Sequence, residues 1–298
     1  MRSRLSTTTS LLQHLESTLQ TFLSSGSRFR VVRTISPSAG GSVPPTRPSP
    51  ALSSLYILDS SFNPPTLAHS ALARVAGVDE SASEQRRLVL LFSTANADKV
   101  ADPSAYVNRL AMVHLFALEL SDSLNRRGKQ SIGQDTIPSD IALTSTAFYS
   151  DKAAAISSTS TPVYPPQTRQ IYLLGYDTFT RFLSPKYYSS HEPPLSALDS
   201  FFASGCELCV MMRPDGSESA REEQAGYLAR LRDGMLNDVG FRAEWSEKIE
   251  MVEAEKDAVG VSSTVVREAV ADGRHDDLQR LCFPSVARWI EEHGLYKR

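Results

Sequence analysis

The sequence is short of cysteine, has no long apolar run and has no large excess of either charge. Three cysteines among 298 residues are too few for a disulfide framework, which favours a reducing compartment. No apolar stretch approaches the roughly 20 residues that a membrane-spanning helix needs. Lys and Arg total 31 against 34 Asp and Glu, so the basic excess typical of nucleic-acid-binding proteins is missing. We therefore expect a soluble protein with no membrane or nucleic-acid partner.

Several common active-site motifs are also missing. The sequence contains no G-x-x-x-x-G-K-[ST], no G-x-G-x-x-G at a strand end, no H-E-x-x-H and no G-x-S-x-G. These absences weigh against P-loop, dehydrogenase, zincin and hydrolase chemistry. Cys206 and Cys209 form a lone C-x-x-C inside an apolar run, without a second pair or a His cluster. This pattern favours ordinary strand packing over a zinc site, and we expect no protein-held metal.

The first 33 residues are rich in Arg and Ser and include Glu16 as their only acid, a composition that resembles a mitochondrial transit peptide. A folded structure is the competing interpretation, and we favour it because leucines and Phe22 recur at helical spacing and residues 29–35 have a strand-like pattern. Residues 36–54 form a Pro/Ser/Gly linker. We predict an N-terminal extension over 1–54 and a main domain over 55–298. A cytoplasmic or nuclear location is expected, with a mitochondrial one as the alternative, and the sequence is compatible with a homo-oligomer.

Short apolar runs alternate with segments of helical periodicity along the main domain. This alternation predicts an α/β fold with a doubly wound, mostly parallel sheet and a helical C-terminal part from residue 262. Polar stretches near 121–167 and 215–248 are predicted insertions, the first with a strand-like piece at 141–143 and the second including a helix at 221–231. The expected strands of the sheet are 55–58, 87–92, 170–174, 207–212 and 249–252.

Residues 55–73 predict a strand, a tight turn and the start of a helix. We expect Asn63 to cap this helix and Pro64 and Pro65 to occupy its first turn. Thr66 and His69 are three residues apart, so they should share one helical face near the positive end of the helix.

The same stretch predicts a place for phosphate. Backbone amides of Ser60, Ser61 and Phe62 should point toward the spot that the helix N-terminus and the imidazole of His69 also face. Such a convergence of N–H groups is a common anion-binding arrangement.

Residues 261–267 combine small hydroxyl residues, a helix start and a cation. Ser262 or Ser263 can cap the helix, and Thr264 and Arg267 should then point the same way near its positive end. Taken singly, this motif and the helical His69 are more often structural than functional.

The two motifs together resemble a known enzyme family. Ser-Phe-Asn-Pro-Pro-Thr-x-x-His near the start of the sheet and Val-Ser-Ser-Thr-Val-Val-Arg near its end are similar to the T/H-x-x-H and I-S-S-T-x-x-R motifs of the nucleotidyltransferase superfamily. The nicotinamide mononucleotide adenylyltransferase family is the best match. The resemblance covers 55–296 apart from the polar insertions, and it includes Asn96, Lys99, Arg109, Met112, residues 175–177 and residues 210–213.

The resemblance implies a Rossmann-like nucleotidyltransferase fold and an enzyme of NAD (pyridine nucleotide) biosynthesis. The 5′-phosphate of nicotinamide mononucleotide, or of its acid form, would attack the α-phosphorus of ATP, giving a dinucleotide and pyrophosphate, with Mg²⁺ arriving with ATP. His69 and Arg267 would be the catalytic residues. ATP would be bound by Ser61, Phe62, His69, Gly175, Ser263, Thr264, Val265, Val266 and Arg267. The mononucleotide would be bound by Ser60, Ser61, Lys99, Asp177, Tyr188 and Arg213.

Some positions differ from the family pattern. Ser60 replaces a Gly, Val259 replaces an Asn, and Tyr188 and Phe148 stand where the family has tryptophans. These differences keep two alternatives open: transfer to another phosphorylated acceptor or simple ATP hydrolysis, and a nucleotide-binding regulatory protein without turnover. The joint presence of His69, Thr264 and Arg267 favours an active enzyme.

Overall fold

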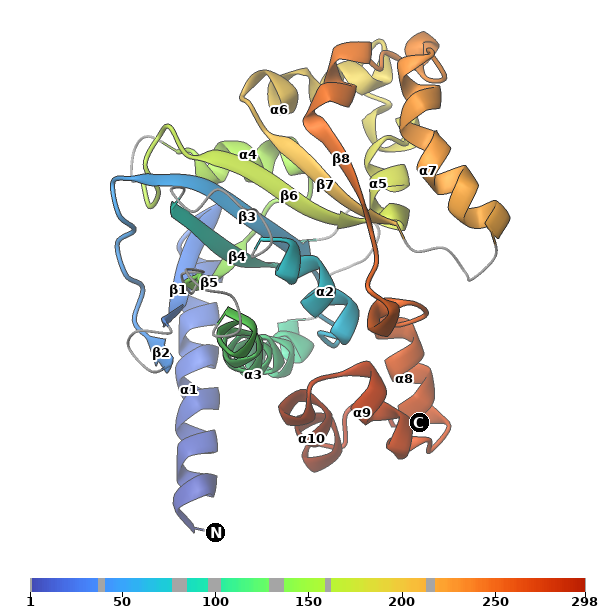
Figure 1. Cartoon of the computed structure of the whole chain (residues 1–298). Helices are drawn as coiled ribbons and strands as arrows, with labels where there is room; N and C mark the ends of the chain where they lie inside the picture. The colour runs from blue at the N-terminus through green and yellow to red at the C-terminus, as the bar shows by residue number, and fades with distance from the viewer. Residues whose placement is uncertain are drawn as a thin grey trace.

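One mixed sheet runs through the whole protein in this computed structural model, which describes residues 2–36, 41–76, 85–95, 103–128, 137–158, 162–212 and 218–297. The described residues form eight strands in the order β2-β1-β5-β4-β3-β6-β7-β8 (Figure 1). Neighbours from β5 to β8 are parallel, whereas β1 runs antiparallel to β2 and β5. The strands are β1 (Phe29–Ser36), β2 (Gly41–Val43), β3 (Leu52–Ser60), β4 (Gln85–Ser93), β5 (Ser139–Thr144), β6 (Arg169–Gly175), β7 (Glu207–Met212) and β8 (Ile249–Glu253).

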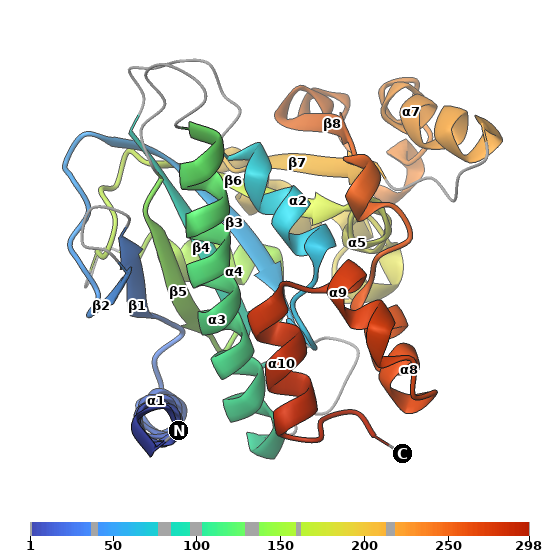
Figure 2. The ribbon, with the colours of Figure 1, turned by 60° about the horizontal axis from the view of Figure 1, so that its bottom comes forward.

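Helices cover both faces of the sheet, which confirms the predicted doubly wound α/β fold. One face carries α1, α2, α3 and the C-terminal helices α8 to α10, and the other carries α4 to α7 (Figures 1 and 2). The α-helices of the described residues are α1 (Arg2–Ser24), α2 (Leu67–Val75), α3 (Pro103–Gly128), α4 (Tyr149–Ile156), α5 (Tyr176–Phe182), α6 (Asp199–Ala203), α7 (Glu218–Arg232), α8 (Ser263–Ala271), α9 (Leu278–Leu281) and α10 (Pro284–Glu292).

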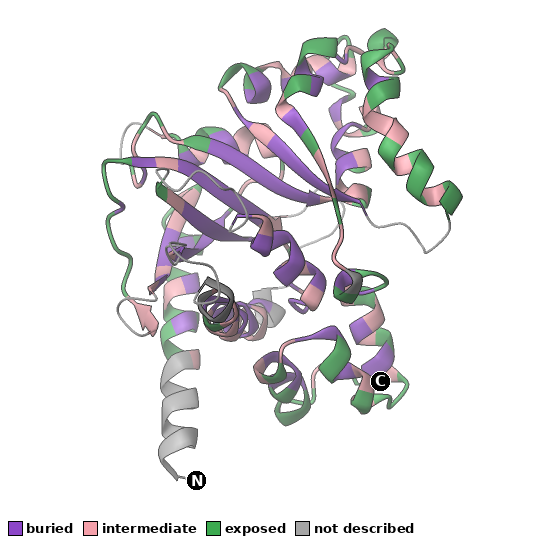
Figure 3. Cartoon of the chain, in the orientation of Figure 1, coloured by how far each residue is buried: buried purple, intermediate pink, exposed green. Residues whose placement is uncertain are grey.

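The central strands are apolar along their length because helices bury both of their faces. On β3, Leu55 and Ile57 face the α4–α7 side, and Tyr56 and Leu58 face the α2–α3 side. Figure 3 shows the continuous burial of these strands. Their alternation between two separate cores explains why the sequence gives short apolar runs rather than a polar–apolar alternation.

The order in which the chain adds strands to the sheet reverses between β3 and β6, although these two strands are parallel. From β3 the chain moves through β4 to β5 on one side, and it then returns to build β6, β7 and β8 on the other side. In parallel sheets, a crevice opens at such a switch point, beyond the carboxyl ends of the strands, and ligands bind there. The fold therefore singles out the ends of β3 and β6 as the place to look for a site.

The N-terminal segment is folded onto the rest of the chain. Leu15, Leu19 and Phe22 of α1 are buried in the same core as α3, and β1 adds antiparallel to β5. Residues 41–43, inside the predicted linker, pair with β1 as β2. Residues 12–36 thus pack against α3 and β5.

The strand β5 lies inside the stretch predicted as a polar insertion, and it is fully buried. Its Asp140 carboxylate accepts hydrogen bonds from the Arg87 guanidinium at 2.9 Å, the Thr34 hydroxyl at 2.6 Å and the Tyr164 hydroxyl at 2.8 Å. Burial raises the pKa of Asp140, and the positive charge of Arg87 opposes that rise. This network lets a polar strand occupy the interior, because every buried charge has a partner.

A buried histidine between α1, α3 and β1 gives a pH-dependent stability. The pKa of His114 is lowered from 6.5 to about 4, mostly by burial and in smaller part by the positive charges of Arg33 and His14. As pH falls through 6.5, the unfolded chain takes up a proton that folded His114 refuses, so stability is lost with acid. From pH 7 to pH 5 we expect a loss of about 2 kcal/mol.

Urea unfolding at the two pH values measures this loss. His114→Gln should remove most of this pH-dependent step, and the exposed His191→Gln should retain it. An unchanged step in His114→Gln would show that other groups cause the acid sensitivity.

Candidate active site

An open cavity occupies the switch point of the sheet. The ends of β3 and β6 form its floor, and the N-terminal turns of α2 and α8 form its walls. Its empty space, including the part that is open to solvent, is about 600 Å³. Polar lining residues include Ser60, Thr66, His69, Ser262 and Ser263, and Gly175 also lines the cavity. Both sequence motifs therefore meet at this cavity.

The turn before α2 differs from the prediction. The helix begins at Leu67 with Thr66 as N-cap, so Asn63 is not the cap and Pro64 and Pro65 precede the helix. Asn63 instead uses its side-chain oxygen to accept a hydrogen bond from Tyr296 at 2.8 Å. The capping prediction was wrong because a contact across more than 200 residues of sequence decides the role of Asn63.

His69 is held in a defined orientation and tautomer. Its Nδ1 accepts a hydrogen bond from the Thr66 backbone N–H at 3.0 Å, as in a capping box. In the neutral ring the proton must then be on Nε2, because one nitrogen is the acceptor. Nε2 lies 2.9 Å from the hydroxyl oxygen of Ser60. The imidazole thus presents an N–H donor to the cavity, beside the positive end of α2.

The amide of Phe62 has a partner inside the protein. Phe62 has a left-handed backbone with φ of 43°, and its buried ring packs against His69 with ring centroids 5.2 Å apart. Its N–H donates to the Ser60 hydroxyl oxygen at 3.2 Å. The predicted convergence of amides is therefore modified, because the Ser60 side chain already accepts from one of them.

The N-cap of α8 is one of the two serines, Ser262 and Ser263, that the sequence offers for this role. Ser262 is the N-cap, and its hydroxyl oxygen accepts from the Val265 N–H at 3.2 Å. Arg267 donates to the Thr264 hydroxyl at 3.0 Å, so these two side chains lie together as expected. Val266 is buried in the core, so only its backbone is available near the helix start.

Two contacts from α8 join it to the turn after β3. The Ser263 hydroxyl donates to the Pro64 carbonyl at 2.7 Å, and an Arg267 N–H donates to the Asn63 carbonyl at 2.7 Å. These bonds hold the two motifs side by side, although about 200 residues separate them in sequence. The walls of the cavity are thereby fixed to one another.

A third element fixes the same turn from the opposite side. Arg109 of α3 donates from Nε to the Ser61 carbonyl at 2.9 Å and makes a second bond to it through Nη2. Its guanidinium carbon lies 4.9 Å from the centre of the Phe92 ring and 5.1 Å from that of Tyr106. Because the turn's carbonyls are occupied in this way, its conformation is determined by α3 and α8 together.

The residues predicted for the mononucleotide are spread more widely. Asp177 is exposed in the first turn of α5. The N-cap of that helix is Gly175, which is predicted to bind ATP and which lines the cavity. Tyr188 lies in the α4–α7 core, where its hydroxyl donates to the Phe182 carbonyl at 2.9 Å. The half-exposed Phe148 ring is 6.1 Å from it. Lys99 and Arg213, like Asn96, lie outside the described residues.

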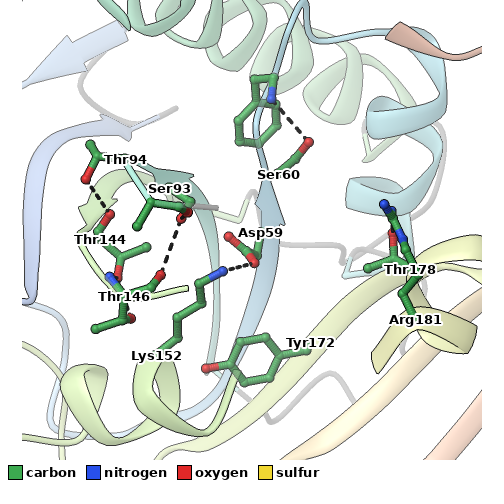
Figure 4. A network of polar contacts seen from close by, with 12 residues as sticks. Asp59, Ser60, Ser93, Thr94, Thr144, Thr146, Lys152, Tyr172, Thr178 and Arg181 are labelled. Atoms are coloured by element: carbon green, nitrogen blue, oxygen red, sulfur yellow. Dashed lines mark hydrogen bonds and ion pairs between the residues drawn. The ribbon is translucent and has the colours of Figure 1, made fainter. Parts of the chain in front are cut away.

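A buried ion pair beside the cavity was not predicted. Asp59, which lines the cavity just before Ser60, accepts from Lys152 of α4 at 2.5 Å, and both side chains are nearly inaccessible (Figure 4). Burial is the largest cause that raises the pKa of the Tyr149 hydroxyl, and the charge of Asp59 and its hydrogen bond raise it further. In the sequence, the only indication of this ion pair was that Asp59, a charged residue, follows an apolar strand. Its partner in a later helix could not be found from spacing.

Comparison with known proteins gives one similar curated protein and several similar structures. A Schizosaccharomyces pombe protein, provisionally named as a nicotinamide mononucleotide adenylyltransferase, is 32% identical over 231 residues, 77% of this chain and 80% of its own length. Two structures of Plasmodium falciparum nicotinic acid mononucleotide adenylyltransferase, in complexes with NaAD and with APC, match at 15% and 14% identity. Their TM-scores are 0.43 and 0.42, and each match covers 82% of this chain and 97% of theirs. No protein-family model matches the sequence.

None of the helices in the described parts of the chain has the length and apolar character needed to cross a bilayer. Across the same described ranges, no three or more His, Cys, Asp or Glu side chains gather in a way that could hold a metal ion.

Proposed function

Because the chain belongs to the nicotinamide mononucleotide adenylyltransferase family, we propose that it is the enzyme that transfers AMP from ATP to nicotinamide mononucleotide or its acid form. The products are NAD, or its acid counterpart, and pyrophosphate. The observation that supports this most is the junction of the two motifs. The imidazole N–H of His69 and the start of α8 face one cavity at the switch point of the sheet.

The proposed reaction is a direct displacement at phosphorus. An oxygen of the acceptor's 5′-phosphate forms a bond to the α-phosphorus of ATP, and the bond from that phosphorus to the pyrophosphate oxygen breaks. Little covalent chemistry is needed from the protein, so positioning and charge stabilisation supply the rate. We assign the Nε2–H of His69 to the phosphate oxygens where negative charge develops. The amides at the start of α8, with Arg267, would hold the β- and γ-phosphates.

We propose that Mg²⁺ enters with ATP as part of the substrate. Mg²⁺ commonly binds substrate phosphates and keeps several of its waters. The ion would offset charge on the phosphates, while the protein supplies N–H donors rather than a dedicated set of metal ligands.

The structure supports the ATP part of this proposal more strongly than it supports the identity of the acceptor. Tyr188 is 7% exposed and its hydroxyl is engaged within the core, so little of its ring is available to stack on a pyridine. This observation favours, as a second candidate, transfer to another phosphorylated acceptor or hydrolysis of ATP at the same cavity.

Labelled ATP separates these reactions. With nicotinamide mononucleotide and Mg²⁺, adenylyl transfer places an α-³²P label in a dinucleotide and a γ-³²P label in pyrophosphate. Release of the γ label as inorganic phosphate would instead identify an ATPase. Retention of both labels in ATP with every acceptor, together with measurable ATP binding, would support a regulatory protein and contradict the proposal.

Arg267→Ala should weaken ATP binding by roughly tenfold to hundredfold, the range for losing hydrogen bonds from a charged group. The variant also loses the bond to the Asn63 carbonyl, so a small decrease in melting temperature is expected without unfolding. Isothermal titration calorimetry measures the affinity. Arg274→Ala is the control, because Arg274 is exposed and pairs with Asp272 and Asp277. Unchanged ATP affinity in Arg267→Ala would assign Arg267 a purely structural role.

A further inference from the structure

Two N–H donors share one acceptor, the hydroxyl of Ser60, which lines the cavity. The distances from its oxygen are 2.9 Å to Nε2 of His69 and 3.2 Å to the backbone nitrogen of Phe62. Because Thr66 donates to Nδ1 of His69, the shared Nε2 contact must be a donation from the ring to Ser60. An oxygen that accepts from both an imidazole N–H and a main-chain N–H has the surroundings of a bound phosphate oxygen.

We propose that Ser60 is an internal substitute for a nucleotide phosphate and sets the affinity of this cavity for phosphate groups. Each donor has one hydrogen, so a phosphate oxygen can take both hydrogens only after the Ser60 side chain turns away. Ser60 follows Asp59 at the end of β3 (Figure 4). Because Ser60 lines the cavity, there is space into which its hydroxyl can turn. This inference rests on the proposed function in one respect, the assignment of the cavity to phosphates.

The need to displace the Ser60 hydroxyl lowers the affinity of the cavity for phosphate but does not abolish binding. Binding replaces two neutral hydrogen bonds with charge-assisted ones, which are stronger, so phosphate still binds. The bonds to Ser60 must be broken first, and each neutral bond in a protein changes an equilibrium by a few-fold to about tenfold. A chain without this hydroxyl would leave His69 and Phe62 bonded to water, which a phosphate displaces more readily. Ser60 is thus a positioning residue that holds the donors while the cavity is empty.

Calorimetric titrations of Ser60→Ala and Ser60→Gly test the inference. The probes are ATP with Mg²⁺, inorganic tripolyphosphate with Mg²⁺, and adenosine, which lacks phosphate. Both variants should bind ATP and tripolyphosphate about threefold to tenfold more tightly than the wild type, and adenosine equally. Ser53→Ala is the matched control, because it removes a bonded hydroxyl from the other end of the same strand. Its affinities should equal those of the wild type.

Other outcomes overturn the inference in distinguishable ways. Weaker phosphate binding in both variants would show that the Ser60 hydroxyl donates to the ligand. Tighter binding in Ser60→Gly alone would assign the effect to the Cβ atom, and equal shifts for adenosine would indicate a general change of structure. Absence of tripolyphosphate and ATP binding in all chains would contradict both this inference and the proposed function. Phosphate binding without NAD synthesis contradicts only the proposed function.

Discussion

His69→Ala should lower kcat for dinucleotide formation by on the order of 100-fold or more, the scale for losing one preorganised donor at a developing charge. The imidazole is fixed by the Thr66 N–H at 3.0 Å, and its Nε2–H is held at the cavity by the Ser60 hydroxyl until a phosphate oxygen replaces that hydroxyl. Loss of that donor removes stabilisation that is strongest in the transition state, so kcat should fall more than ATP affinity. Steady-state rates measured at varied ATP and saturating acceptor separate the change in kcat from the change in KM for ATP.

Two variants make this result specific. The alanine also removes the partner of the Thr66 N–H, which should cost about 1 kcal/mol of stability, so melting curves must show that the variant is folded at the assay temperature. His69→Gln can accept from Thr66 and still carries an N–H donor, and it should recover part of the rate. His191→Ala, on the exposed surface, should leave the rate unchanged. Wild-type turnover in folded His69→Ala would remove His69 from the mechanism.

Arg87→Ala should lower the free energy of unfolding by about 3–5 kcal/mol, the usual result of removing one partner from a buried ion pair. The Arg87 and Asp140 side chains are 9% and 1% exposed, and the variant leaves the carboxylate without its cation. Burial already raises the pKa of Asp140, and loss of Arg87 removes the charge that opposes this rise. The folded variant should therefore hold a proton that the unfolded chain releases, so its deficit should shrink as pH falls.

Urea denaturation at pH 7 and pH 5 measures both effects. Arg86→Ala is the matched control, since this neighbouring side chain is half-buried and donates to the Ala76 carbonyl at 3.0 Å; we expect a cost of about 1 kcal/mol. The double variant Arg87→Met with Asp140→Leu should regain much of the lost stability, because no buried charge then lacks a partner. A cost below 1 kcal/mol for Arg87→Ala would show that water or another group compensates the carboxylate.

Much of the fold follows from local pattern. The apolar runs that predict β3, β4, β6 and β7 are buried on both faces by helices, and this environment is what selects such runs. The run that predicts the edge strand β8 is only partly buried. The strand β5 escaped full recognition because Asp140 and its neighbours are polar. Its burial depends on Arg87, Thr34 and Tyr164, which come from other parts of the chain. Pattern within one segment does not contain that information.

The site shows the same division between local and distant causes. The start of α8 at Ser262 and the proximity of Thr264 to Arg267 follow from helical spacing, and the structure agrees with both. The role of Asn63 does not, because Arg267 and Tyr296 determine it from far along the chain. The position of the Ser60 hydroxyl between two donors is also a matter of three-dimensional packing. The sequence showed only that a serine replaces a glycine in the turn.

The central claim is that the cavity at the switch point catalyses adenylyl transfer to a pyridine mononucleotide. The most direct test incubates the purified chain with ATP, Mg²⁺ and nicotinamide mononucleotide and quantifies NAD and pyrophosphate over time, with His69→Ala in parallel. We predict that the two products appear in equal amounts, that neither forms without the mononucleotide, and that His69→Ala forms both at least about 100-fold more slowly. Consumption of ATP without NAD, or NAD formation that is indifferent to His69, would contradict the account.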